Sequence, residues 1–111
     1  MVRQAVPYFR ELVEYDPDAI AKQWKDRAAA RETLAATRDA LVSQFDWVAE
    51  PLEVALRGLA EARGVSTGKI FQPLRVALTG VTASPGIFDV LVILGRDRSL
   101  RRLDAAVTWL S

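Results

Sequence analysis

Apolar side chains recur at helical spacing along almost the whole chain, and no useful length alternates with the period of two that marks a half-buried strand. The spacing predicts a first helix over residues 6–13, which breaks off before Asp16. Asp16 or Asp18 then caps a short second helix that carries Trp24 on its apolar face. A long, polar-rich helix is expected to follow from about Arg27.

The middle of the chain predicts two further helices that end at glycines. Apolar residues at helical spacing over residues 48–60 predict a helix that Gly64 terminates as a C-terminal cap. Pro73 has no N–H and therefore belongs in the first turn of a helix, so the next one is expected over residues 70–79. Gly80 is expected to end it.

The last part of the chain predicts two more helices and completes the fold class. Ser84 suits the N-cap of the first of them, with Pro85 in its first turn, and Gly95 suits its end. A final helix should start near Asp97 or Arg98. The sequence therefore predicts an all-α protein, a compact bundle of six or seven helices with short connections.

Composition excludes more chemistry than it suggests. The chain has 111 residues, which suits one domain, and a formal net charge of +1. It has no cysteine and no histidine, which excludes disulfides and cysteine nucleophiles and removes the commonest general base and metal ligand. No apolar run approaches the roughly 20 residues of a membrane span, and the charged N-terminus is unlike a signal peptide. We expect a cytoplasmic monomer with no membrane association.

Few patterns suggest catalysis or a metal site. The acid pairs Asp16/Asp18 and Glu50/Glu53 favour helix capping and a solvated face, because neither a base nor a metal cluster accompanies them. The Gly-Lys pair that ends at Lys69 lacks the spacing of a nucleotide-binding loop, so Lys69 is a better candidate for a contact with a nucleic-acid phosphate. The three tryptophans lie on or beside apolar stripes and are expected to pack between helices: Trp24, Trp47 and Trp109.

One basic residue, Arg75, stands inside an otherwise apolar helical run. Leu74 and Leu78 should face the core, and Arg75 is turned from Leu74 by about 100° around the helix. The Ser84-Pro85 turn downstream should present a helix N-terminus with free N–H groups. A guanidinium beside such a helix start can bond the edge of an unstacked base while the N–H groups hold a second base or a phosphate. An exposed or salt-bridged arginine is the alternative.

Six short motifs follow one another between residues 66 and 106. They are GK at 68–69, QPLR at 72–75, ALTG at 77–80, SPG at 84–86, LG at 94–95 and RRL at 101–103. Their order and spacing closely resemble the carboxyl-terminal anticodon-binding domain of bacterial glutamyl-tRNA synthetases. The motifs span somewhat over a third of the chain, and the helical first half is compatible with that family but carries no comparable motif.

The resemblance implies roles for individual positions. In that family the arginine of QPLR reads an anticodon base, so Arg75 is the expected reader, and Ser84 and Ile87 are expected to touch further bases. Ser84 can equally serve as a helix cap, and Ile87 as a core residue. Arg101 and Arg102 are expected at phosphates or, alternatively, in ion pairs with Asp89 or Asp97. The other positions expected at the RNA surface are Lys69, Gln72, Pro85 and Gly86.

The resemblance also implies a parent enzyme, an ATP- and Mg-dependent glutamate–tRNA ligase, with glutamate tRNA as the partner of this domain. The catalytic domain of that family carries HIGH-like and KMSKS-like motifs, and neither is present here. We therefore expect an isolated domain with Met1 as an added start, without a cofactor and without aminoacylation of its own. Its expected organisation is one domain over residues 1–111, in which residues 1–64 support the anticodon-reading helices of residues 65–111.

Two other functions remain open. The first is a helical protein–protein interaction module, with tryptophans and apolar stripes partly exposed. The second is a helix-turn-helix protein that binds DNA, but the helix after Ser84 is mostly apolar and offers almost no side chains that could contact base edges. We therefore expect no DNA partner.

Overall fold

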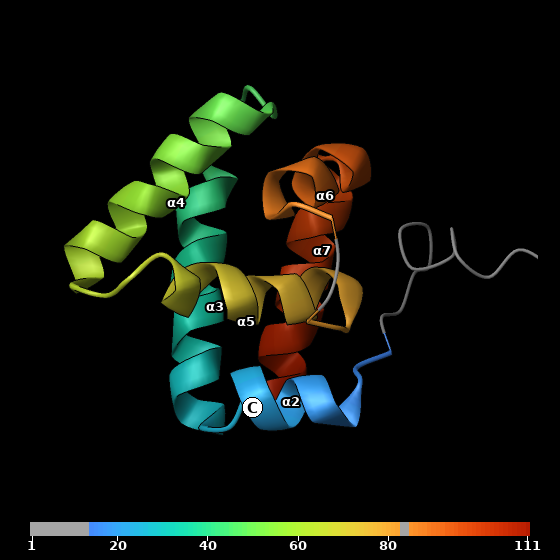
Figure 1. Cartoon of the computed structure of the whole chain (residues 1–111). Coiled ribbons are helices and arrows are strands. Elements are labelled where there is room, and N and C mark those ends of the chain that lie inside the picture. Colours follow the sequence, from blue (N-terminus) through green and yellow to red (C-terminus); the bar gives the residue numbers. More distant parts are fainter. Residues whose placement is uncertain (1–13, 83–84) are drawn as a thin grey trace, which may run out of the picture.

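Six α-helices and no strands form residues 14–82 and 85–111, the parts of the chain that this computed structural model describes (Figure 1). This confirms the predicted all-α class, while the first helix expected over residues 6–13 lies outside the described residues. The helices are α2 (Pro17–Gln23), α3 (Arg27–Val42), α4 (Ala49–Arg63), α5 (Gly68–Thr79), α6 (Ile87–Leu94) and α7 (Arg96–Leu110).

Several helix boundaries follow directly from capping residues. The carboxylate of Asp16 accepts a hydrogen bond from the backbone at the start of α2, and that of Asp26 accepts one at the start of α3. Gly64 and Gly80 end α4 and α5 in the left-handed conformation, with φ of 69° and 83°. Residues with a Cβ rarely adopt this conformation, which explains why glycine stands at both positions.

The start of α5 differs from the prediction. The helix begins at Gly68, so Pro73 lies inside it and not in its first turn. The N–H groups of Ile70 and Phe71 both bond the carbonyl of Thr67 and so form the first turn ahead of the proline. Pro73 is tolerated because it costs one hydrogen bond in a helix that its neighbours hold in place from several sides.

The starts of α6 and α7 also differ from the prediction. α6 begins at Ile87 with Gly86 as its N-cap and without a side-chain cap, and the expected cap, Ser84, lies outside the described residues. Gly95 ends α6, as predicted, and α7 starts directly after it at Arg96. The two helices therefore meet at a corner of a single residue.

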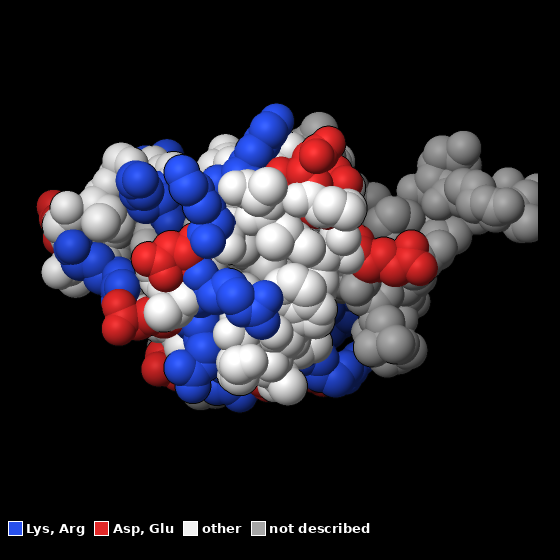
Figure 2. All heavy atoms as spheres, turned by 90° about the horizontal axis from the view of Figure 1, so that it is seen from below, with Lys and Arg blue, Asp and Glu red and all other residues white. Residues whose placement is uncertain are grey.

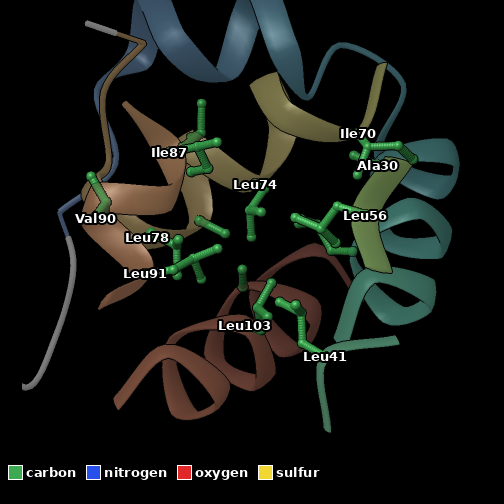
Figure 3. Packing of buried hydrophobic residues seen from close by; sticks show 14 of the residues in the cluster. Ala30, Leu41, Leu56, Ile70, Leu74, Leu78, Ile87, Val90, Leu91 and Leu103 are labelled. Carbon is green, nitrogen blue, oxygen red and sulfur yellow. The ribbon is translucent and has the colours of Figure 1, made fainter. Parts of the chain in front are cut away.

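α5 is the central helix of the fold. It crosses the pair formed by α3 and α7 and contacts each of the other five described helices (Figure 1). Figure 3 shows Leu74 and Leu78 of α5 among core leucines from the helices around it. Most of the helix is buried, namely Ile70, Pro73, Leu74, Val76, Ala77, Leu78 and Thr79.

α3 and α7 run antiparallel, and hydrogen bonds join them along their length. Arg27 at the start of α3 donates to the carbonyl of Trp109 near the end of α7, at 2.8 Å. Arg38 pairs with Asp104 near the middle. At the other end, Arg96 of α7 donates to the carbonyl of Gln44 at 3.2 Å, just beyond α3. These bonds fix the register of the two helices that α5 crosses.

Distant donors satisfy the carbonyl groups near the C-terminal end of α5. The last four carbonyl groups of an α-helix have no hydrogen-bond donor within the helix itself. The backbone N–H of Asp16 bonds the Gly80 carbonyl at 2.8 Å. The guanidinium of Arg102 in α7 bonds the Leu78 carbonyl at 2.6 Å through Nη1. A buried cation at this point also complements the negative end of the helix dipole.

An aromatic cluster closes the lower end of the bundle. The Trp24 ring is buried, and its Nε1 donates to the Pro73 carbonyl at 3.3 Å. Tyr15 and Trp109 pack against it edge-on or tilted, with ring centroids 4.8–5.6 Å apart. Trp47 is half-buried and bonds the Leu91 carbonyl. The predicted packing role is thus confirmed for all three tryptophans, although Trp109 stays 41% exposed.

The Arg102 contact predicts a difference between two neighbouring arginines. Arg102→Met removes the donor to the Leu78 carbonyl in the core and should lower the free energy of unfolding by about 1.5–3 kcal/mol, the range for hydrogen bonds to charged groups. Arg101→Met alters an exposed side chain of the same helix and should change it by less than about 0.5 kcal/mol. Urea unfolding followed by circular dichroism measures both values. Equal effects of the two substitutions would contradict the assignment.

The Tyr15 phenol predicts a loss of stability at alkaline pH. Burial raises the pKa of Tyr15 above its ordinary value of 10.0, and the charge of Arg102 opposes part of this rise. Above about pH 10 the unfolded chain loses this proton more readily than the folded one, so stability falls as the pH rises further. Tyr15→Phe should therefore show a shallower alkaline decline. Parallel curves of unfolding free energy against pH for wild type and variant would refute this cause.

Candidate nucleic-acid interface

Arg75 lies on the third turn of α5, at the boundary between the core and the surface. Its backbone lies between the buried residues Leu74 and Val76, while its own side chain is only partly exposed. Nη1 donates to the carbonyl of Pro85 at 2.9 Å, which links α5 to the segment that leads into α6. The structure thus brings together the two motifs that the sequence analysis associated, the arginine of QPLR and the proline of SPG.

Thr79 shapes the turn that follows Arg75. Its hydroxyl donates to the Arg75 carbonyl at 2.8 Å, one helical turn back. The same oxygen lies 3.3 Å from the N–H of Val81 and accepts from it. The hydroxyl of the buried Thr79 therefore links the last turn of α5 to Val81, the residue after the glycine that ends the helix.

Two aromatic rings lie beside Arg75. Phe71 precedes Arg75 by four residues and so lies on the same face of α5. The ring of Phe88 in α6 packs edge-on against the Phe71 ring, with a centroid distance of 5.4 Å. Both rings are half-buried. Arg57 of α4 lies over the Phe71 ring at 5.8 Å and also pairs with Glu53. The sequence analysis missed these three residues, because helical periodicity alone assigns both phenylalanines to the core.

Pro85 also lines a mostly apolar hollow. The cavity measures about 410 Å³ and is formed by the start of α4, Pro85 and the outer face of α6. Asp89 is its one charged lining residue. Its other lining residues are Val48, Ala49, Pro85, Val92 and Ile93.

The remaining predicted contact residues are spread over the surface. Gln72 is partly exposed one turn before Arg75, and Gly86 is exposed beside Pro85. Together with Phe71, Arg75, Pro85 and Phe88 they form a continuous surface, which we call the Arg75 face. Lys69 is exposed in the first turn of α5, and Arg101 is exposed on α7 beside a hollow at the α6–α7 corner.

Two of the predicted contact residues are buried. Ile87 is 3% exposed and lies in the core cluster of Figure 3, which agrees with the alternative of a core residue. Arg102 is 2% exposed and bonds α5, so a direct contact with phosphate or an ion pair with Asp89 or Asp97 does not describe its place in this structure. Both side chains are therefore buried in this structure.

Two other kinds of site find no support in the described part of the chain. Residues 14–82 and 85–111 contain no group of three or more acidic side chains that could hold a metal ion. Within the same ranges, no helix combines the length and the apolar character needed to cross a bilayer.

Comparisons with known proteins agree on one family. The family model described as "Anticodon binding domain" matches residues 1–107. The chain is 42% identical over 104 residues to a glutamate–tRNA ligase of Roseiflexus castenholzii and 47% identical over 104 residues to one of Anaeromyxobacter dehalogenans. These alignments cover 94% of the chain but only 20% and 22% of the two relatives, so the chain spans about a fifth of their length.

Solved structures give the same relation. The crystal structure of a glutamate tRNA ligase from Elizabethkingia meningosepticum, in complex with its amino acid, superposes with a TM-score of 0.85 at 28% identity. That match covers 95% of this chain and 20% of the other. A glutamate-tRNA synthetase from Elizabethkingia anophelis superposes with a TM-score of 0.73 at 26% identity, over 92% of this chain and 19% of the other.

Proposed function

The chain belongs to the family of anticodon-binding domains found in glutamate–tRNA ligases, and from this premise we propose that it recognises the anticodon loop of glutamate tRNA through the Arg75 face. The observation that carries the proposal is the contact between Arg75 and Pro85, which joins two motifs ten residues apart into one surface. Anticodon bases are single-stranded and can be unstacked, which is the form in which proteins read RNA sequence.

The guanidinium of Arg75 supplies the means of reading a base. It is planar and carries five N–H donors, so a carbonyl partner and a base edge can share it. The backbone of Arg75 is held between buried neighbours, and its guanidinium is positioned by the hydrogen bond to Pro85. Little side-chain entropy therefore remains to be lost on binding. A reader that is positioned in advance discriminates between bases better than a mobile one.

The surroundings of Arg75 supply apolar surface for the bases themselves. The rings of Phe71 and Phe88 are partly exposed, and Pro85, the partner of Arg75, lines an apolar hollow. Base–aromatic stacking contributes about 1–3 kcal/mol per base. Asp89 at the hollow can accept a hydrogen bond from an exocyclic amino group, as acidic side chains do from cytosine.

The further contacts of the proposal lie around this face. Gln72 and Gly86 border it, and Lys69 and Arg101 are exposed at positions suited to phosphates. Ser84, which lies outside the described residues, is proposed as a further base contact. In a complete enzyme this binding would position the acceptor end of the tRNA at a distant site where ATP and Mg serve the joining of glutamate. The domain would act there as one body of 1–111, with residues 65–111 in contact with the RNA.

Substitution of Arg75 tests the proposal. Arg75→Ala should weaken binding of the glutamate-tRNA anticodon stem-loop by about 5- to 150-fold, which corresponds to the roughly 1–3 kcal/mol of one bidentate base contact. It should leave binding of a stem-loop with a scrambled loop nearly unchanged. Arg75→Lys keeps the charge but not the planar fork, so it should lose most of the preference as well. Fluorescence anisotropy at fixed salt measures both affinities.

Arg57→Ala serves as a matched control, because Arg57 is also an arginine beside Phe71 but lies one helix away from Pro85. It should reduce affinity for both loops alike. Thermal unfolding of each variant separates loss of binding from loss of fold. If wild type binds both loops equally and Arg75→Ala changes neither affinity, the anticodon proposal fails and a helical protein-interaction module becomes the better account.

A further inference from the structure

All three lysines of the chain line a single cavity. The sequence contains only Lys22, Lys25 and Lys69. They come from the end of α2, the α2–α3 connection and the start of α5, and each side chain is exposed. Arg63 at the end of α4 lines the same cavity, which measures about 350 Å³. Four separate segments therefore contribute one cation each, and we call this site the lysine cavity.

The lysine cavity carries a net positive charge. Among its lining residues in the described part of the chain, Asp26 alone is acidic, and its carboxylate already accepts a hydrogen bond from the N–H of Ala29 as the cap of α3. Arg63 pairs with Glu32 at 3.3 Å, so its charge is partly compensated. The three lysines form no ion pair with an acid of the described residues. Seen from below, basic side chains interspersed with acidic ones gather on the left of the molecule (Figure 2).

The electrostatic repulsion among these cations favours the binding of an anionic ligand. Like charges gathered on one surface repel each other and destabilise the compact state, and a bound polyanion relieves this repulsion. The start of α5 adds the positive end of a helix dipole, and Gly68 there brings backbone close to the cavity. Ammonium groups suit phosphate as point charges without demanding a fixed orientation.

We infer that the lysine cavity is a second RNA site, which binds the sugar–phosphate backbone of the same RNA that the Arg75 face reads. The inference rests on the proposed function and names a contact outside the Arg75 face. Lys69 and Arg75 lie six residues apart on α5, which corresponds to about 9 Å along the helix axis. One RNA strand can span that distance, so the cavity supplies affinity for any sequence while Arg75 supplies discrimination.

The salt dependence of binding separates the two contributions. Lys22→Gln/Lys25→Gln should reduce the slope of log affinity against log salt by about 1.4–1.8, because each lost phosphate contact removes roughly 0.7–0.9. The ratio of affinities for the correct and the scrambled stem-loop should stay within about twofold of the wild-type ratio. Arg75→Ala should do the reverse, with a large change in the ratio and a small change in the slope.

Arg27→Gln/Arg31→Gln is the matched control, since it removes two positive charges from exposed side chains of α3 that do not line the cavity. It should change the slope by less than half as much. A second readout is direct: reductive ¹³C-methylation labels the lysines without removing their charge. Their three NMR signals should shift on addition of either stem-loop.

The outcomes distinguish this inference from the function on which it rests. If wild type prefers the correct loop through Arg75 but the lysine double variant keeps the wild-type slope and the lysine signals stay in place, the cavity is not an RNA site and only the anticodon proposal stands. If the slope falls and the signals shift while Arg75→Ala has no effect, the cavity is supported and the Arg75 assignment fails. Absence of binding by either stem-loop overturns both.

Discussion

The burial of α5 is the constraint on which the rest of the structure depends. A helix that contacts five others cannot solvate its own ends, so its terminal carbonyls need partners from elsewhere in the chain. Arg102 from α7 and the backbone of Asp16 before α2 provide them. The Trp24 indole adds a third bond to the same helix at Pro73. The outer helices are therefore arranged around hydrogen bonds to α5 as well as around apolar contacts with it.

This constraint explains why the candidate contacts lie where they do. Because nearly every side of α5 is covered, Arg75 is its one charged side chain between buried neighbours that still reaches the surface. The hydroxyl of Thr79 and the carbonyl of Pro85 then fix both the end of the helix and the head of the arginine. A core helix thus holds the residue that should recognise a base, while Phe71 of the same helix, Phe88 of α6 and Pro85 contribute apolar surface. Sites supported in this way keep their geometry better than sites built on loops alone.

The sequence predicted the fold class and most helix ends because these depend on local chemistry. A glycine at a left-handed position and an aspartate before a helix leave a signal within a few residues, as at Gly64, Gly80 and Asp16. The interior position of Pro73 and the burial of Arg102 could not be predicted in this way, because both depend on packing between segments far apart in the chain. The Arg75–Pro85 link was predicted through motif order, whereas Phe71, Phe88 and Arg57 were missed because their partial exposure is a tertiary property.

Arginine and lysine occupy different kinds of position in this structure. Arginines occupy positions where a planar fork bonds a defined carbonyl or carboxylate, as Arg27, Arg38 and Arg102 do. The three lysines instead line one cavity, where no carbonyl or carboxylate of residues 14–82 or 85–111 fixes their position. An arginine held in place gains discrimination from its geometry, and a lysine loses little by remaining mobile beside a phosphate that carries no sequence information. Under the two proposals, α5 would carry recognition near its C-terminal end and electrostatic attraction at its N-terminal end.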